Sequence, residues 1–252
     1  MLEDTTLKLK KTLQRGLWSL GYHVGSFPPV DSLAYHLKLL LSRLEIDCVI
    51  DVGAHDGEFA RFLRDLGYQG EIVSFEPVKA TFERLCAAFA GDPHWRGLNV
   101  ALGTESGVRT MNIYAGSVFN SFLPPSEFGR ARFDDLACPV RSEAVMVRRL
   151  EDIIDEHFAT GRTPRVFLKM DTQGWDLQVL EGAGRRLDAI IALQTEVSVK
   201  PIYDEMTGFA EAIRRIGELG FELTGMFPVA RDRDQLRLVE LDCVMMRSPG
   251  GA

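Results

Sequence analysis

From residue 46 onward, short runs of apolar residues alternate with longer amphipathic stretches. The apolar runs predict strands at 48–51, 71–75, 98–101, 165–170, 189–196, 221–223 and 243–246. The amphipathic stretches predict helices at 58–66, 80–90, 150–158, 175–181 and 209–219. Repeated strand–helix units with apolar strands are typical of a mostly parallel sheet that helices cover on both faces. The pattern therefore predicts an α/β, Rossmann-like fold of about seven strands with an antiparallel edge strand, and residues 108–113 and 144–147 predict extra strands in an insertion.

The first 45 residues follow a different pattern, which predicts a helical extension. Residues 7–20 predict an amphipathic helix with an apolar face formed by Leu7, Leu13, Leu17 and Leu20. Residues 25–29 contain two prolines and break the chain, and Asp31 is expected to cap a second helix that ends near residue 44. The chain is therefore divided into an extension, 1–45, and a Rossmann-like domain, 46–248. The first helix is expected to pack on the domain, with a membrane-surface or homo-oligomer contact as the alternative.

Charge, cysteine spacing and hydropathy indicate which partners and which cellular compartment to expect. The formal net charge is -7, whereas a protein that binds nucleic acid usually presents a dense basic face. The four cysteines are far apart and form no C-x-x-C motif, which is typical of free thiols in a reducing compartment. The chain has no apolar run of the ~18 residues that a membrane span requires, and its acidic start is unlike a signal peptide. We therefore expect a cytoplasmic protein with no nucleic-acid partner and no transmembrane segment.

A glycine-rich turn follows the first predicted strand of the domain. The segment V-I-D-V-G-A-H-D-G places Gly53 and Gly57 four residues apart, so that the backbone can turn sharply and approach a ligand closely. It matches neither the G-x-G-x-x-G fingerprint nor the lysine-bearing phosphate loop. Asp51 and Asp56 would repel a pyrophosphate and suit a cationic ligand. The alternative is that the D-x-G sequence is only a tight turn.

The second predicted strand ends at Glu76 and Pro77, about twenty residues beyond the glycines. An acid at this place can accept hydrogen bonds from both hydroxyls of a ribose, as in dinucleotide-binding folds. Pro77 lacks an N–H group and helps to end the strand. The spacing therefore indicates a nucleoside site.

Several segments together resemble the FkbM family of class I S-adenosylmethionine-dependent methyltransferases. They are D-V-G-A-H-D-G, G-Y-Q-G-E-I-V-S-F-E-P, N-V-A-L-G and F-L-K-M-D-T-Q-G-W-D-L-Q-V-L-E-G-A, in this order, and the resemblance covers residues 47–247. It implies S-adenosylmethionine as cofactor, with Glu76 as the ribose ligand. It also implies a cofactor turn and an adenine-side loop made of Asp51, Gly53, Ala54, His55, Asp56, Gly57, Pro77, Asn99, Ala101 and Leu102. His55 stands where such turns often have Asn, so that it either stabilises the turn or takes part in catalysis.

The predicted catalytic face follows the fourth and fifth strands of the domain. Asp171 ends the fourth strand and can orient or deprotonate an acceptor hydroxyl. Lys169 is one strand period earlier, on the same face, and can pair with Asp171. Glu196 is expected beside Asp171, where the two carboxylates can share a proton or hold a divalent metal, an alternative that stays open. The family commonly has K-x-D-x-E-G at this segment, whereas Gln173 replaces the second acid here.

The acceptor is expected to be a small molecule. The resemblance implies O-methylation of a hydroxyl, such as that of a sugar, glycolipid, polysaccharide or polyketide. Tyr203, Gln173, Asn120 and Ser121 are candidate substrate residues, although Asn120 and Ser121 also suit a surface turn. Two alternatives remain, an NAD-dependent oxidoreductase and a non-catalytic nucleoside-binding module.

Overall fold

The computed structural model describes residues 17, 20, 28–136, 138–157 and 163–248. Two compact units are distinguished, 1–37 and 38–252, and the sheet belongs to the second. Most of the helix predicted over 7–20 lies outside the described residues, and with it the homo-oligomer contact. The predicted second helix is α2 (Leu33–Arg43). Asp31 was the wrong cap, because the amide of Tyr35 donates to Ser32 Oγ at 3.2 Å.

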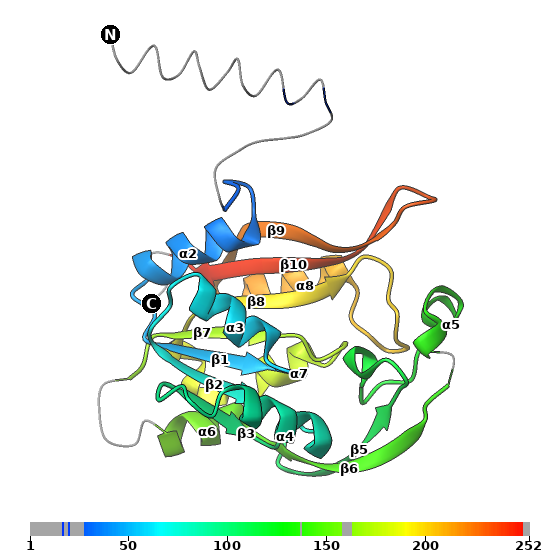
Figure 1. Ribbon diagram of the computed structural model, residues 1–252, viewed down its shortest axis with the longest axis horizontal. Coiled ribbons are helices and arrows are strands. Elements are labelled where there is room, and N and C mark those ends of the chain that lie inside the picture. Colours follow the sequence, from blue (N-terminus) through cyan, green and yellow to red (C-terminus); the bar gives the residue numbers. More distant parts are fainter. Residues whose placement is uncertain (1–16, 18–19, 21–27, 137, 158–162, 249–252) are drawn as a thin grey trace. The chain divides into compact units, whose positions relative to one another are not determined.

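A seven-stranded sheet forms the centre of the second unit, in the order β3-β2-β1-β7-β8-β10-β9 (Figure 1). The strands are β1 (Cys48–Val52), β2 (Glu71–Phe75), β3 (Trp95–Leu98), β7 (Val166–Met170), β8 (Ile190–Ser198), β9 (Phe221–Asp232) and β10 (Arg237–Arg247). Neighbours from β3 to β8 pair in parallel, whereas β10 is antiparallel to both β8 and the edge strand β9. The predicted mostly parallel sheet with an antiparallel edge pairing is confirmed.

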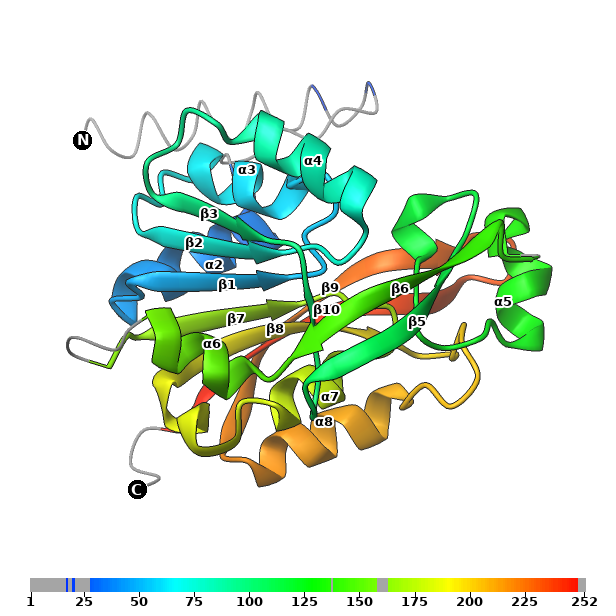
Figure 2. The same cartoon turned by 90° about the horizontal axis from the view of Figure 1, so that it is seen from below.

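Helices cover both faces of this sheet, as the alternating pattern predicts. The helices are α3 (Glu58–Asp65), α4 (Lys79–Ala88), α6 (Leu150–His157), α7 (Asp176–Glu181) and α8 (Phe209–Glu218). Figure 2 shows α3 and α4 on one face and α6, α7 and α8 on the other. The main hydrophobic core joins Ile50 and Leu168 of the sheet to Ile153, Leu180 and Ile216 of the second helix layer. Among the described residues, none of the helices is both long and apolar enough to span a bilayer.

The third strand differs from the prediction. Residues 98–101 do not form one strand, because the chain leaves the main sheet after Leu98 and the next short strand, β4 (Ala101–Leu102), belongs to a second sheet. That second sheet has the order β4-β6-β5 and contains the two strands expected in the insertion, β5 (Gly107–Ile113) and β6 (Arg141–Arg148). The Asn99 side chain accounts for the bend, since its amide donates to the carbonyl oxygens of Glu76 at 2.9 Å and Pro77 at 3.0 Å.

Between β5 and β6 the insertion forms a short 3-10 helix, η1 (Ser117–Phe119), the helix α5 (Glu127–Arg132) and a second 3-10 turn, η2 (Asp134–Leu136). A further 3-10 helix, η3 (Gly184–Ala189), leads into β8. A separate hydrophobic cluster packs the insertion against the loop after β8, with Leu123, Leu136, Ile202 and Tyr203 among its buried members. The insertion is therefore an ordered part of the unit, next to the ends of β7 and β8.

Candidate functional site

Polar side chains meet on one face of the sheet at the carboxyl ends of its central strands. Asp51 of β1 is directly opposite Ser74 of β2 on one side and Lys169 of β7 on the other. Lys169 is in turn opposite Gln194 of β8. Residues paired in register point to the same face, so that these four side chains share it. Ligands of open α/β sheets bind beyond this end of the strands.

The predicted cofactor turn lies between β1 and α3. Gly53 and Gly57 have φ values of 75° and 85°, in the left-handed region that favours glycine. A Cβ atom on Gly53 would lie 1.9 Å from the backbone oxygen of Asp171, so that only glycine fits this close approach. The amides of Gly53 and Ala54 both donate to the carbonyl oxygen of Phe75 at 3.0 Å. The turn is thus fixed against both neighbouring strands, β2 and β7.

Glu76 is held over this turn by two backbone amides. His55 N donates to Glu76 Oε2 at 3.1 Å, and Val78 N donates to Oε1 at 2.8 Å. The carboxylate is buried, and burial raises its pKa, against the lowering effect of the two amides. A carboxylate oxygen has two acceptor positions, so that each oxygen of Glu76 can still accept one hydrogen bond from a ligand.

The two acids of the turn have protein partners. Asp51 is fully buried and lies 3.4 Å from the ammonium of Lys169, and Asp56 Oδ1 lies 2.9 Å from Arg84 Nε of α4. Asp51 therefore supports the turn from beneath. In the predicted adenine-side loop, Asn99 ties the ends of β2 and β3 together, and Ala101 and Leu102 are buried in β4.

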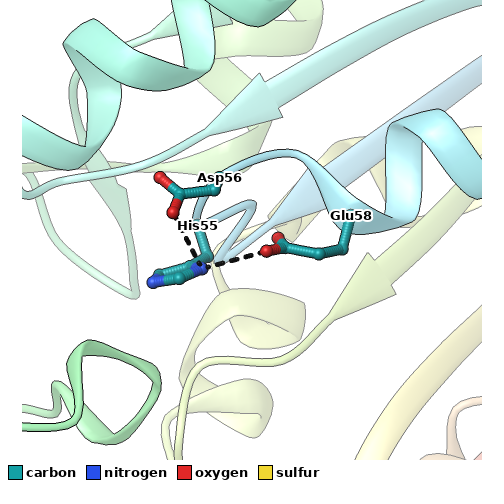
Figure 3. Close-up of side chains that lie close together, drawn as sticks. All are labelled: His55, Asp56 and Glu58. Atoms are coloured by element: carbon teal, nitrogen blue, oxygen red, sulfur yellow. Dashed lines mark hydrogen bonds and ion pairs between the residues drawn. The ribbon is translucent and has the colours of Figure 1, made fainter.

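His55 lies at the mouth of the turn, with its imidazole between two carboxylates (Figure 3). Its Nδ1 is 3.4 Å from Glu58 Oε1 and 3.9 Å from Asp56 Oδ2. Its Nε2 is 2.7 Å from Ser117 Oγ of η1. Within the described part of the chain, His55, Asp56 and Glu58 form the group of three donors whose spacing can hold a metal ion. Sequence reasoning missed Ser117, which lies 62 residues from His55 along the chain.

Lys169 is buried beneath the turn, where it contacts both halves of the site. Its Nζ lies 3.4 Å from Asp51 Oδ1, 3.5 Å from Asp171 Oδ2 and 3.4 Å from the carbonyl oxygen of Gly53, to which it donates. Burial by itself lowers the pKa of Lys169, but the carboxylates of Asp171 and Asp51 outweigh it and the pKa is raised. A lysine that stays charged orients its neighbours and does not act as a base.

Asp171 and Glu196 are joined by the side chain of Gln173. Gln173 Nε2 donates to Asp171 Oδ1 and to Glu196 Oε2, at 3.1 Å each. Gln173 Oε1 lies 3.0 Å from the hydroxyl of Tyr203, which is itself 2.8 Å from the carbonyl oxygen of Phe119. Burial, and then the charge of Asp171, raise the pKa of Glu196 well above its ordinary value. The Asp171 side chain is 38% exposed and is therefore accessible from solvent.

The two residues predicted in the insertion make internal contacts. Ser121 is fully buried, and its Oγ donates to the backbone oxygen of Gln173 at 2.7 Å. Asn120 Oδ1 accepts from the amide of Tyr114 at 3.0 Å. Both side chains therefore shape the insertion beside the site.

Two acids of β10 also belong to this face and were missed. Asp242 is directly opposite Glu196, and Glu240 is opposite Ser198, whose Oγ donates to it at 3.1 Å. Burial raises the pKa of Glu240 to about 7 and that of Asp242 to about 6. The signal was present in the segment V-E-L-D-C, where acids alternate with apolar residues.

The sheet order and the turn after β1 define the class of protein, a Rossmann-like fold of the class I methyltransferase type. Residues 51–223 match the model of the methyltransferase FkbM domain, and the chain belongs to this family. Methyltransferase sdnD of Sordaria araneosa is 24% identical over 153 residues, which make up 53% of this chain and 59% of that protein.

Two solved structures are also similar. A putative methyltransferase from Thermobifida fusca YX has a TM-score of 0.49 at 10% identity, over 86% of this chain and 79% of that one. Magnesium protoporphyrin IX methyltransferase from Synechocystis PCC 6803, solved with bound SAM, has a TM-score of 0.46 at 10% identity, over 87% and 78%. The family itself is established by the match over residues 51–223.

Proposed function

We propose that the protein binds S-adenosylmethionine at the turn between β1 and α3 and transfers its methyl group to a hydroxyl of a small molecule. Acceptors of the proposed class are sugars, glycolipids, polysaccharides and polyketides. The observation that supports the cofactor most directly is Glu76. Its two oxygens are fixed by the amides of His55 and Val78, and each keeps one acceptor position for a ribose hydroxyl.

The residues present fit this cofactor. Gly53 and Gly57 adopt the left-handed φ values that let the chain turn tightly at the carboxyl end of β1, where ligands of open α/β sheets bind. The bound cofactor supplies a methyl group that is already activated, so that the protein chiefly has to position the acceptor. Asp171 is proposed to accept the proton that the acceptor hydroxyl would lose on methylation, while S-adenosylhomocysteine would be the leaving group. The charged Lys169 beside it holds the carboxylate and the Gly53 turn in one arrangement.

Calorimetry with two ligands, followed by a transfer assay, separates this proposal from its alternatives. We expect S-adenosylhomocysteine to bind with micromolar affinity and NADH to give no heat of binding. Tight NADH binding without S-adenosylhomocysteine binding would instead indicate an oxidoreductase. Incubation with trideuteromethyl-labelled S-adenosylmethionine and fractionated small-molecule extract, followed by mass spectrometry, then tests transfer. Cofactor binding without label in any fraction or in the protein would favour a non-catalytic nucleoside-binding module.

A further inference from the structure

The Gln173 amide lies between two carboxylates and has a hydrogen-bond partner on every side. Its Nε2 group has two protons, and the two acceptors at 3.1 Å, Asp171 and Glu196, account for both. Its Oε1 faces the Tyr203 hydroxyl at 3.0 Å. Both N–H groups of the Gln173 side chain are therefore used within the protein, and only one acceptor position of Oε1 is left for the substrate role that its sequence position suggested.

The orientation of the amide follows from its neighbours. If the amide were rotated by 180°, its oxygen would face the two carboxylates and its NH2 group would face Tyr203. In that rotated form the oxygen would face two acids and both N–H contacts to them would be lost. In the present orientation both amide protons have an acceptor, and the single proton of the Tyr203 hydroxyl is shared between Gln173 Oε1 and the carbonyl oxygen of Phe119. Tyr203 is almost fully buried, and burial raises its pKa, so that it stays a protonated donor.

Contacts of the backbone also hold Gln173 in place. Its φ is 54°, in the left-handed region that L side chains rarely adopt. The buried Ser121 hydroxyl donates to its carbonyl oxygen at 2.7 Å, and the next residue, Gly174, has a φ of 93°. Such a conformation persists where the surroundings fix it, as they do here.

We propose that Gln173 is a positioning residue that clamps Asp171 and Glu196 in the place where a divalent cation would otherwise bridge them, and so sets this site for metal-independent transfer. Its part in turnover rests on the proposed function, whereas the clamp itself does not. Two N–H groups pointing at the space between the acids leave a cation neither room nor a ligand. A third carboxylate at the same position would instead complete a set of oxygen ligands of the kind that hard divalent cations take.

Manganese titration by calorimetry tests the clamp without any activity. We expect Gln173→Glu to bind Mn²⁺ roughly tenfold or more tighter than the wild type. The His55–Asp56–Glu58 group is present in both proteins and contributes equally. Gln235→Glu, on the exposed hairpin turn, is the matched control and should behave as wild type. Equal or weaker Mn²⁺ binding by Gln173→Glu would overturn the proposal.

Methyl-transfer kinetics are the second test of the proposal. EDTA should leave wild-type methyl transfer unchanged. Gln173→Met should lower kcat by roughly tenfold or more and move the acidic limb of the pH profile upward, because the two acids lose the N–H donors that stabilise their charged forms. S-adenosylhomocysteine affinity should stay within about twofold in both variants. Loss of wild-type activity in EDTA, or a Gln173→Met variant with wild-type rate and pH profile, would contradict the proposal.

If the wild type fails to bind S-adenosylhomocysteine, the proposed function is wrong. The manganese titration still shows in that case whether Gln173 keeps a cation from binding between Asp171 and Glu196. If Gln173→Met does not fold, the manganese titration of the near-isosteric Gln173→Glu variant tests the proposal by itself.

Discussion

The ammonium of Lys169 lies 3.4 Å from Asp51 Oδ1, and neither side chain has more than marginal contact with solvent. Asp51 also accepts from Ser74 Oγ at 3.2 Å, and Trp95 Nε1 donates to Ser74 Oγ at 3.1 Å. Burial raises the pKa of Asp51, and the charge of Lys169 opposes that rise. This pair links β1, which leads into the predicted cofactor turn, to β7, which leads into the predicted catalytic face.

Breaking this pair on one side should destabilise the fold. Lys169→Met leaves Asp51 buried without its cation, which typically costs about 3–5 kcal/mol. Urea denaturation followed by circular dichroism measures the change. The double variant Lys169→Met, Asp51→Asn removes both charges and should recover a large part of the loss. If the single and double variants are equally unstable, the loss comes from packing and the ion pair is not its source.

Removing the carboxylate of Glu76 should weaken cofactor binding. Glu76→Ala loses the acceptors for a ribose and also the acceptors for the amides of His55 and Val78. The binding free energy of S-adenosylhomocysteine should therefore become less favourable by about 1.5–3 kcal/mol. Titration calorimetry checks this. Glu71→Ala, at the exposed opposite end of β2, is the matched control and should bind normally. Unchanged affinity in Glu76→Ala would remove this residue from the site.

The hydrogen bond between His55 and Ser117 should hold the insertion over the cofactor turn. Ser117→Ala removes it at a cost of about 1 kcal/mol, which corresponds to roughly fivefold more opening of the segment around η1. Hydrogen exchange read by mass spectrometry should show faster exchange in residues 114–123, whereas Ser142→Ala on exposed β6 should leave that segment unchanged. Identical exchange in the Ser117→Ala and wild-type proteins would show that other contacts hold the segment.

The sequence predicted the parts of the fold where each strand is a continuous apolar run. Strands β1, β2 and β7 are buried along nearly their whole length, so that burial and sequence pattern coincide. The long hairpin of β9 and β10 was underestimated, because β9 is an edge strand that contains Gly225 and Pro228 and whose exposed positions are both apolar and polar. The break between β3 and β4 depends on the hydrogen bonds of Asn99, which a local pattern does not reveal.

The site was predictable to the extent that parallel strands bring their carboxyl ends together. That rule places Asp51, Glu76, Asp171 and Glu196 at one edge, and the structure places them there. It does not say which groups touch. The bridge by Gln173 and the contact of Ser117 with His55 join residues 23 and 62 positions apart, through turns whose shape depends on the whole fold.

Glu240 should make stability depend on pH. Its pKa in the folded protein is raised to about 7 from an ordinary value of 4.5. As the pH rises above 4.5 the unfolded chain releases this proton first, while the folded protein keeps it, so that stability falls between about pH 4.5 and 7, by up to about 3 kcal/mol. Glu240→Gln should flatten that fall and stabilise the protein at pH 8, as urea denaturation at pH 5 and 8 will show. Glu105→Gln on the surface should leave the slope unchanged. A Glu240→Gln slope equal to that of the wild type would assign the dependence to another group.

Asp171 should be the residue most needed for turnover. It ends β7 beside the cofactor turn, its side chain is 38% exposed, and Lys169 and Gln173 fix its two oxygens. Asp171→Asn keeps the shape and removes the carboxylate, so that kcat should fall by about 100-fold or more while S-adenosylhomocysteine affinity changes little. Lys169 keeps Asp51 as its partner in this variant, and the fold should therefore survive, in contrast to Lys169→Met. Kinetics with a hydroxyl acceptor, calorimetry and urea denaturation on the same preparation separate the three effects. Asp234→Asn on the exposed hairpin turn is the matched control. Normal turnover in Asp171→Asn would transfer the role of base to His55 or Glu196, whereas loss of the fold would indicate that Asp171 is chiefly a partner of the buried lysine.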